Sequence, residues 1–124
     1  MNDDGQQFLE RLAQSPHRTF ERHFARAAIS LNLGPVLSAA ELEMLYRAAY
    51  LATLCNIAFN GLGGCASKIK PEREANRVRL ERSYMMARDV FYATLGWSSI
   101  GESRKSRVQN VFLAVSIAEH NLLR

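Results

Sequence analysis

Few residues in this chain have types and spacings that could support catalysis. Nucleophilic catalysis needs a serine or cysteine beside a base and an orienting group, and no segment carries a recognisable nucleophile motif. Cys65 is the one thiol expected to be exposed, and its glycine-containing surroundings favour a passive loop residue. Basic residues lie close to every Asp and Glu, so no carboxylate pair stands out. We therefore predict no catalytic residues and a protein that is not an enzyme.

The histidines and glycines do not form a pattern that predicts a metal or cofactor site. His17 and His23 are six residues apart, on opposite sides of a helix, and His120 is remote from both in sequence. The glycines of residues 61–64, with Lys68 and Lys70 nearby, could cradle a phosphate. They follow a helical segment and lack the Gly-Lys-Ser/Thr ending of a P-loop, which favours a plain connection between helices. We predict no metal and no cofactor.

Positive charge gathers in the second half of the chain. The net charge is +4, with +5 on residues 67–124 and −1 on residues 1–66. Arg104, Lys105 and Arg107 cluster there, and with Trp97 they form a candidate contact for an acidic partner surface. A nucleic-acid-binding module is the alternative interpretation. A DNA-reading helix-turn-helix at residues 95–107 is disfavoured, because bulky or charged residues occupy two of its core positions.

Proline, glycine and capping residues divide the chain into helical segments. We predict a short helix over 3–13 and a second one capped by Ser15, with Pro16 as its first residue, that ends at Gly34. Further helices are predicted over 39–60 and 71–95, and a last one extends to about residue 122. Capping boxes are predicted at Ser38/Glu41 and at Ser99/Glu102.

The apolar residues recur at helical spacing, and no segment shows the alternation of a strand. Three segments carry a single stripe each: Phe20, Phe24, Ala27, Ala28 and Leu31; Leu80, Tyr84, Ala87, Phe91 and Leu95; and Val108, Val111, Phe112, Val115, Ala118 and Leu122. The sequence therefore predicts an all-α fold: one domain over 1–124, an antiparallel bundle of four main helices plus a short N-terminal helix.

Residues 39–60 are apolar nearly all round after Met44, which is typical of a helix surrounded by its own domain or by a second subunit. Its Tyr46/Tyr50/Thr53/Ile57 side is either intradomain core or the seam of a two-fold homodimer. We predict that Cys55 is a buried thiol, and a Cys55–Cys65 disulfide is the alternative. Met85 and Met86 add adaptable apolar surface.

These patterns favour a small regulatory protein of bacterial type that binds a protein partner. One version antagonises the dimerisation of a transcription factor. The acidic N-terminus, the two cysteines and the lack of a long apolar run predict a cytoplasmic protein without a membrane partner. A ligand-binding or enzymatic bundle, with Thr53, Cys55 or Asn56 facing inward, is a further alternative. The candidate partner-binding residues are Tyr46, Tyr50, Trp97, Arg104, Lys105 and Arg107.

Overall fold

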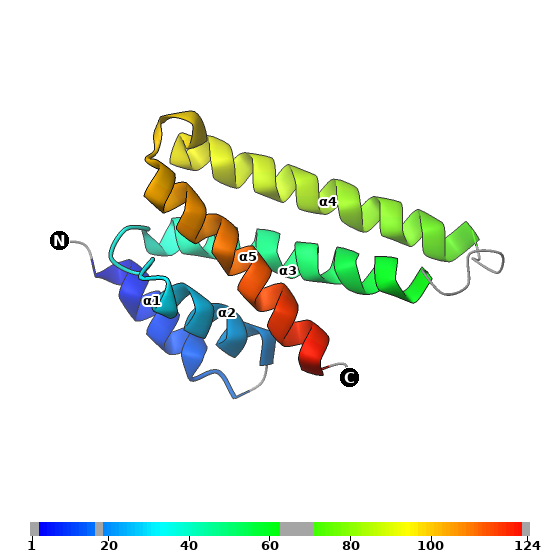
Figure 1. Ribbon diagram of the computed structural model, residues 1–124, viewed down its shortest axis with the longest axis horizontal. Helices are drawn as coiled ribbons and strands as arrows, with labels where there is room; N and C mark the ends of the chain where they lie inside the picture. The colour runs from blue at the N-terminus through cyan, green and yellow to red at the C-terminus, as the bar shows by residue number, and fades with distance from the viewer. Residues whose placement is uncertain (1–2, 17–18, 63–70, 123–124) are drawn as a thin grey trace.

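The computed structural model describes residues 3–16, 19–62 and 71–122, with side-chain environments for 3–16, 19–56 and 71–115. The described elements are α1 (Asp4–Ala13), α2 (Thr19–Ser30), α3 (Ala39–Leu62), α4 (Pro71–Leu95), the short 3₁₀ turn η2 (Trp97–Ser99) and α5 (Glu102–Leu122). Consecutive helices run in opposite directions (Figure 1). The predicted all-α class is confirmed.

Three of the predicted helix boundaries follow directly from local chemistry. The Ser38/Glu41 capping box forms, because the Glu41 amide donates to Ser38 Oγ at 3.1 Å and the Ser38 amide donates to Glu41 Oε1 at 2.9 Å. α4 begins at Pro71 and ends at Leu95, as predicted. Gly96 follows it with φ 65°, a left-handed conformation that glycine adopts without steric cost.

The predicted start of the second helix is wrong. α2 begins at Thr19, so Ser15 is not its cap and Pro16 lies in a bend before it. The Ser15 carbonyl instead accepts a hydrogen bond of 2.6 Å from Arg22 Nη1. This contact ties the segment after the end of α1 to the first turn of α2.

The end of α2 also differs from the prediction, because the helix stops before Gly34. Asn32 takes a positive φ of 60°, and its amide donates to the Ile29 carbonyl at 2.9 Å. The Leu33 amide donates to the Ala28 carbonyl at 3.0 Å. This pair of bonds is the Schellman motif, in which asparagine replaces the more usual glycine.

The second predicted capping box does not form the start of the last helix. Ser99 lies in the η2 turn, where its amide donates to the Gly96 carbonyl at 2.8 Å. α5 begins only at Glu102, and the Lys105 amide bonds back to the Gly101 carbonyl at 3.1 Å. A short 3₁₀ turn and two further residues therefore make the corner between α4 and α5.

The buried core lies around α1, α2, the loop after α2 and the first half of α3. α5 adds one stripe to it, whereas α4 contributes only Phe91 among the described residues. The fully buried large side chains are Leu9, Phe24, Leu33, Leu42, Leu45, Phe91, Val108, Val111 and Val115. The predicted stripes of α2 and α5 thus face the core wherever their side chains are described.

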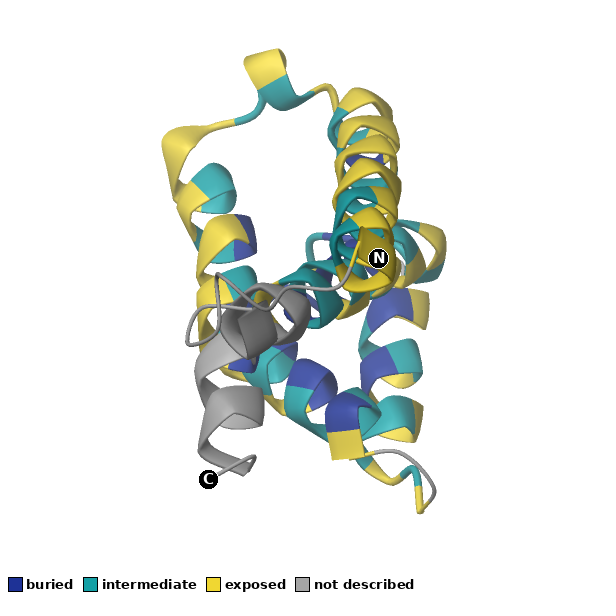
Figure 2. Cartoon of the chain, turned by 90° about the vertical axis from the view of Figure 1, so that its right-hand side faces the viewer, coloured by how far each residue is buried: buried dark blue, intermediate teal, exposed yellow. Residues whose placement is uncertain are grey.

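α4 lies at the edge of the fold. It packs along α3, while α5 crosses α3 obliquely and also packs on α2 (Figure 1). Much of the surface of α4 is consequently exposed (Figure 2). Among the described residues, no helix combines the length and the apolar character needed to span a membrane.

Candidate interaction surfaces

Tyr46 and Tyr50 belong to an aromatic cluster between α2 and α3. The Tyr46 ring lies 5.5 Å from the ring of Phe20 and 5.4 Å from that of Phe24, and Tyr50 lies 5.2 Å from Phe20. These separations and tilted geometries are typical of packed aromatic pairs. Tyr46 is half-buried against the core, and Tyr50 is 39% exposed at its edge. The structure therefore places Tyr46 in intradomain packing.

Thr53 belongs to the same predicted seam and is also turned inward. Its side chain is buried, and its hydroxyl donates to the Ala49 carbonyl at 3.0 Å. A hydroxyl bonded to its own helix needs no external ligand. The side chain of Ile57, the fourth residue of the predicted seam, lies outside the described residues.

Trp97 and Lys105 are brought together at the corner between α4 and α5. Trp97 stacks on Tyr92 with ring centroids 4.0 Å apart, and Lys105 Nζ lies 5.8 Å from the Trp97 centroid. Burial raises the pKa of the hydroxyl of Tyr92, the ring on which Trp97 stacks. Lys105 Nζ also lies 3.8 Å from a carboxylate oxygen of Glu102. The Lys105 charge is thus held by an aromatic ring and a carboxylate of its own chain.

The three predicted cations differ in what they contact within the fold. Arg107 Nη1 donates to the Asn32 carbonyl at 3.3 Å, which directs its guanidinium toward the end of α2. Arg104 is half-buried. Two of the three cations therefore have intramolecular partners that explain their positions. Sequence reasoning placed Lys105 beside Trp97 but missed the partner of Arg107, because Asn32 lies 75 residues away in the chain.

A shallow apolar groove lies where α3, α4 and α5 meet, and the sequence did not predict it. Its volume is about 390 Å³, and it is lined by Ala52, Cys55, Asn56, Tyr84, Gln109, Phe112 and Leu113. The rings of Tyr84 and Phe112 meet edge to face at 6.4 Å. Leu113 stays 60% exposed. One feature of the sequence could have indicated the groove, since Leu113 is a large apolar residue that lies outside the predicted stripe of α5.

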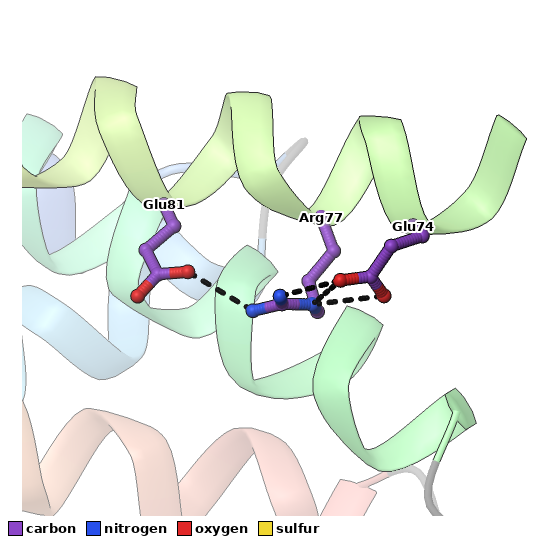
Figure 3. A network of polar contacts seen from close by, with 3 residues as sticks. All are labelled: Glu74, Arg77 and Glu81. Carbon is purple, nitrogen blue, oxygen red and sulfur yellow. Dashed lines mark hydrogen bonds and ion pairs between the residues drawn. The ribbon is translucent and has the colours of Figure 1, made fainter. Parts of the chain in front are cut away.

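An ion-pair network borders this region on α4. The Arg77 guanidinium lies between Glu74, at 2.6 Å, and Glu81, at 2.9 Å, and points toward the second half of α3 (Figure 3). The hydrogen bond from Arg77 lowers the pKa of the Glu74 carboxyl. Such pairs along one helix are typical of a solvated face.

Cys55 lies in the groove but has little nucleophilic character. Burial raises the pKa of its thiol, Glu81 raises it further, and Arg77 acts in the opposite direction. A thiol of raised pKa is largely protonated and reacts slowly. Cys55 is a free thiol and half-buried, so the alternative of a Cys55–Cys65 disulfide is not formed, and the predicted full burial of Cys55 is wrong. Cys65 itself lies outside the described residues.

α4 also leaves large apolar side chains in contact with solvent. Met86 is 70% exposed, Val90 is 55% exposed and Met85 is 45% exposed. Met86 and Val90 border a second small hollow of about 250 Å³ against Met44 and Arg47 of α3. Exposed apolar groups that gather in this way mark interaction surfaces more often than isolated ones do.

Within the described residues, no group of three or more His, Cys, Asp or Glu side chains could hold a metal ion. His17, Lys68 and Lys70 lie outside those residues, as does the side chain of His120. Gly61 and Leu62 form the last turn of α3, and the rest of the glycine segment is not described.

No protein-family model matches the chain, and neither curated proteins nor solved structures gave a significant match.

Proposed function

We propose that this protein is a non-enzymatic regulator that acts by binding another protein in the groove between α3, α4 and α5. The exposure of Leu113, at 60%, beside Phe112 and Tyr84 carries the proposal. Leaving an apolar side chain of this size in water costs about 1.5–3 kcal/mol relative to full burial. A partner that covers Leu113 would recover much of that free energy.

The lining of the groove suggests what the partner presents. The floor is apolar, formed by Ala52, Tyr84 and Phe112, while the amides of Asn56 and Gln109 add polar groups. A helix with an apolar anchor and flanking polar side chains matches such a lining. Partner helices of this kind bind through anchor residues spaced three or four apart.

The cations support protein binding over nucleic-acid binding. Phosphate recognition needs several lysine and arginine side chains directed at one backbone. Lys105 instead contacts Trp97 and Glu102, and Arg107 bonds to Asn32. A regulatory role and a cytoplasmic location remain parts of the proposal. The antagonist of a transcription factor is a narrower form of it that the groove alone does not select.

The test is affinity capture from lysate with two matched variants of α5. Leu113→Asp places a charge in the groove, and Ala114→Asp places the same charge on the adjacent exposed residue, which does not line the groove. Wild type and Ala114→Asp are expected to retain the same discrete protein, with and without nuclease, and Leu113→Asp is expected to lose it.

Two results would contradict the proposal. Equal retention by Leu113→Asp would place binding on another surface, and retention that disappears with nuclease would favour nucleic acid. Circular dichroism of both variants confirms that each is folded before capture. Identification of the retained protein by mass then decides whether it is a transcription factor.

A further inference from the structure

We propose that two copies of this chain associate through the outer face of α4, antiparallel about a two-fold axis that passes between Met85 and Met86. The outer face of α4 denotes the residues that helical spacing places opposite its α3-packing stripe: Ala75, Val78, Arg82, Met85, Met86, Asp89 and Ala93. This inference is separate from the proposed partner groove and needs no second protein.

The outer face lies opposite the side of α4 that packs on α3. The packing side carries Leu80, Tyr84, Ala87, Phe91 and Leu95, and at 100° per residue the two sets fall on opposite sides of the helix. Met86 is 70% exposed and Met85 45% exposed, and Arg82, Asp89 and Ala93 are exposed as well. Val78 is half-buried, and Met86 at the edge of this face also borders the hollow against Met44 and Arg47 of α3.

The outer face is also hollowed along its first half. A shallow depression of about 700 Å³ runs there, and its described lining comes from α4: Pro71, Glu74, Ala75, Val78, Arg79, Arg82, Ser83 and Met86. α4 has 25 residues and is therefore about 37 Å long. A second helix laid along it would contact several apolar side chains, among them Val78, Met85 and Met86, with Arg82 and Asp89 between them.

Charge complementarity identifies the occupant as a second copy. Arg82 stands three residues before Met85, and Asp89 stands three residues after Met86. In an antiparallel two-fold pair, each residue faces the one equally far on the other side of the axis. Arg82 of each copy therefore faces Asp89 of the other, which gives two opposite-charge pairs around a methionine centre.

The neighbouring positions suit the same register. Between the two charge pairs, Met85 of each copy faces Met86 of the other, so the centre is apolar. Outside the charge pairs, Val78 of one copy faces Ala93 of the other, and the small alanine leaves space for the valine. A parallel pairing would instead place Arg82 against Arg82, which repels. The pattern thus selects one orientation as well as one register.

The intramolecular contacts of these charges leave room for the second copy. Arg88 donates to Oδ1 of Asp89 at 3.2 Å, and the Asp89 side chain stays 66% exposed. A carboxylate accepts several hydrogen bonds, so Oδ2 can receive Arg82 of the other copy. Tyr84, which lines the partner groove, lies on the opposite side of α4, and the two surfaces can be occupied together.

A charge-reversal cycle measured by sedimentation equilibrium tests the proposal. Arg82→Glu and Asp89→Arg each place like charges opposite one another twice, and each is expected to weaken dimerisation by about tenfold or more. The double variant R82E/D89R restores both pairs with the signs exchanged, and it is expected to return within about twofold of wild type. Arg26→Glu, at an exposed position of α2, makes the same charge change elsewhere and is expected to match wild type.

Three results would overturn the inference. A wild-type chain that stays monomeric through the concentration range excludes it. A dimer whose affinity neither single reversal changes would also overturn it, because association then uses another surface. A double variant that dimerises no more tightly than the single variants would overturn it as well. Circular dichroism verifies the helix content of every variant. Loss of partner capture by Leu113→Asp would leave the dimer intact, so the two proposals fail independently.

Discussion

The guanidinium of Arg107 donates a hydrogen bond of 3.3 Å to the main-chain carbonyl of Asn32, which joins the start of α5 to the end of α2. The carbonyls at a helix C-terminus carry partial negative charge and lack intrahelical donors. Asn32 follows the last residue of α2, Ser30, so the guanidinium lies close to the negative end of that helix. Arg107, a predicted partner-binding residue, therefore has an intramolecular partner at Nη1, while its buried Nε has none among the described residues.

Removing this contact should weaken the fold. Arg107→Ala is expected to lower the free energy of unfolding by about 1 kcal/mol, the usual net worth of one such hydrogen bond. For a domain of this size, the melting temperature should fall by about 4 °C. Thermal denaturation followed by circular dichroism measures the change. Arg104→Ala serves as the control and should change stability by less than about 0.5 kcal/mol; an equal loss in both variants would count against this role of Arg107.

Gly5 allows α1 to approach the loop between α2 and α3. A Cβ atom at residue 5 would clash with the Leu37 carbonyl and lie 2.7 Å from the Gly34 carbonyl, both main-chain groups that cannot rotate away. Gly5→Ser is therefore expected to destabilise the protein by about 1–3 kcal/mol, as overpacking does. Urea denaturation gives the value.

The matched control for Gly5 is Gly101→Ser. No heavy atom lies within 4 Å of a Cβ built there, and the residue precedes the first turn of α5, where serine is a favourable cap. Its stability should equal or slightly exceed that of wild type. A Gly5→Ser protein as stable as Gly101→Ser would show that α1 can shift away from the loop.

The two predicted capping boxes should respond differently to alanine. Ser38→Ala removes the bond from the Glu41 amide and is expected to cost about 1 kcal/mol of unfolding free energy. Ser99 belongs to the η2 turn, not to a helix cap, so Ser99→Ala should be near neutral. Parallel urea titrations compare the two. A larger loss for Ser99→Ala would mean that α5 extends back through the η2 turn in solution.

The Glu74 carboxyl should titrate below the range of a free glutamate, because it accepts hydrogen bonds from Arg77. A pKa that is depressed on folding contributes stability above the unfolded-state pKa, and that contribution is lost as the pH falls through the folded-state pKa. Solvent screening keeps it small, since Glu74 is 44% exposed. Side-chain NMR titration should show the Glu74 midpoint rise in Arg77→Gln. An unchanged midpoint would mean that the pair does not persist in solution.

Several features were predictable from the sequence because they depend on neighbouring residues. The Ser38/Glu41 box and the limits of α4 follow from backbone capping within a single turn. The start of α2 was not predictable in this way, because Ser15 is an acceptable cap. A contact from Arg22 holds its carbonyl outside the helix.

The candidate surfaces were less predictable than the helices. Tyr46 and Tyr50 were expected on either a core or a dimer seam, and the rings of Phe20 and Phe24 place Tyr46 in the core. The groove around Leu113 depends on how α4 and α5 lie on α3, which helical periodicity does not encode.

The all-α class, the apolar stripes and most helix limits follow from the order of the residues alone, because caps and periodicity act over three or four residues. Which helix faces are covered depends on the packing of the helices on one another. α4 carries an apolar stripe that packs on α3, and it leaves Met85 and Met86 exposed on its other side. Burial depends on the directions in which whole helices cross, and those directions follow from the summed packing of residues far apart in the chain.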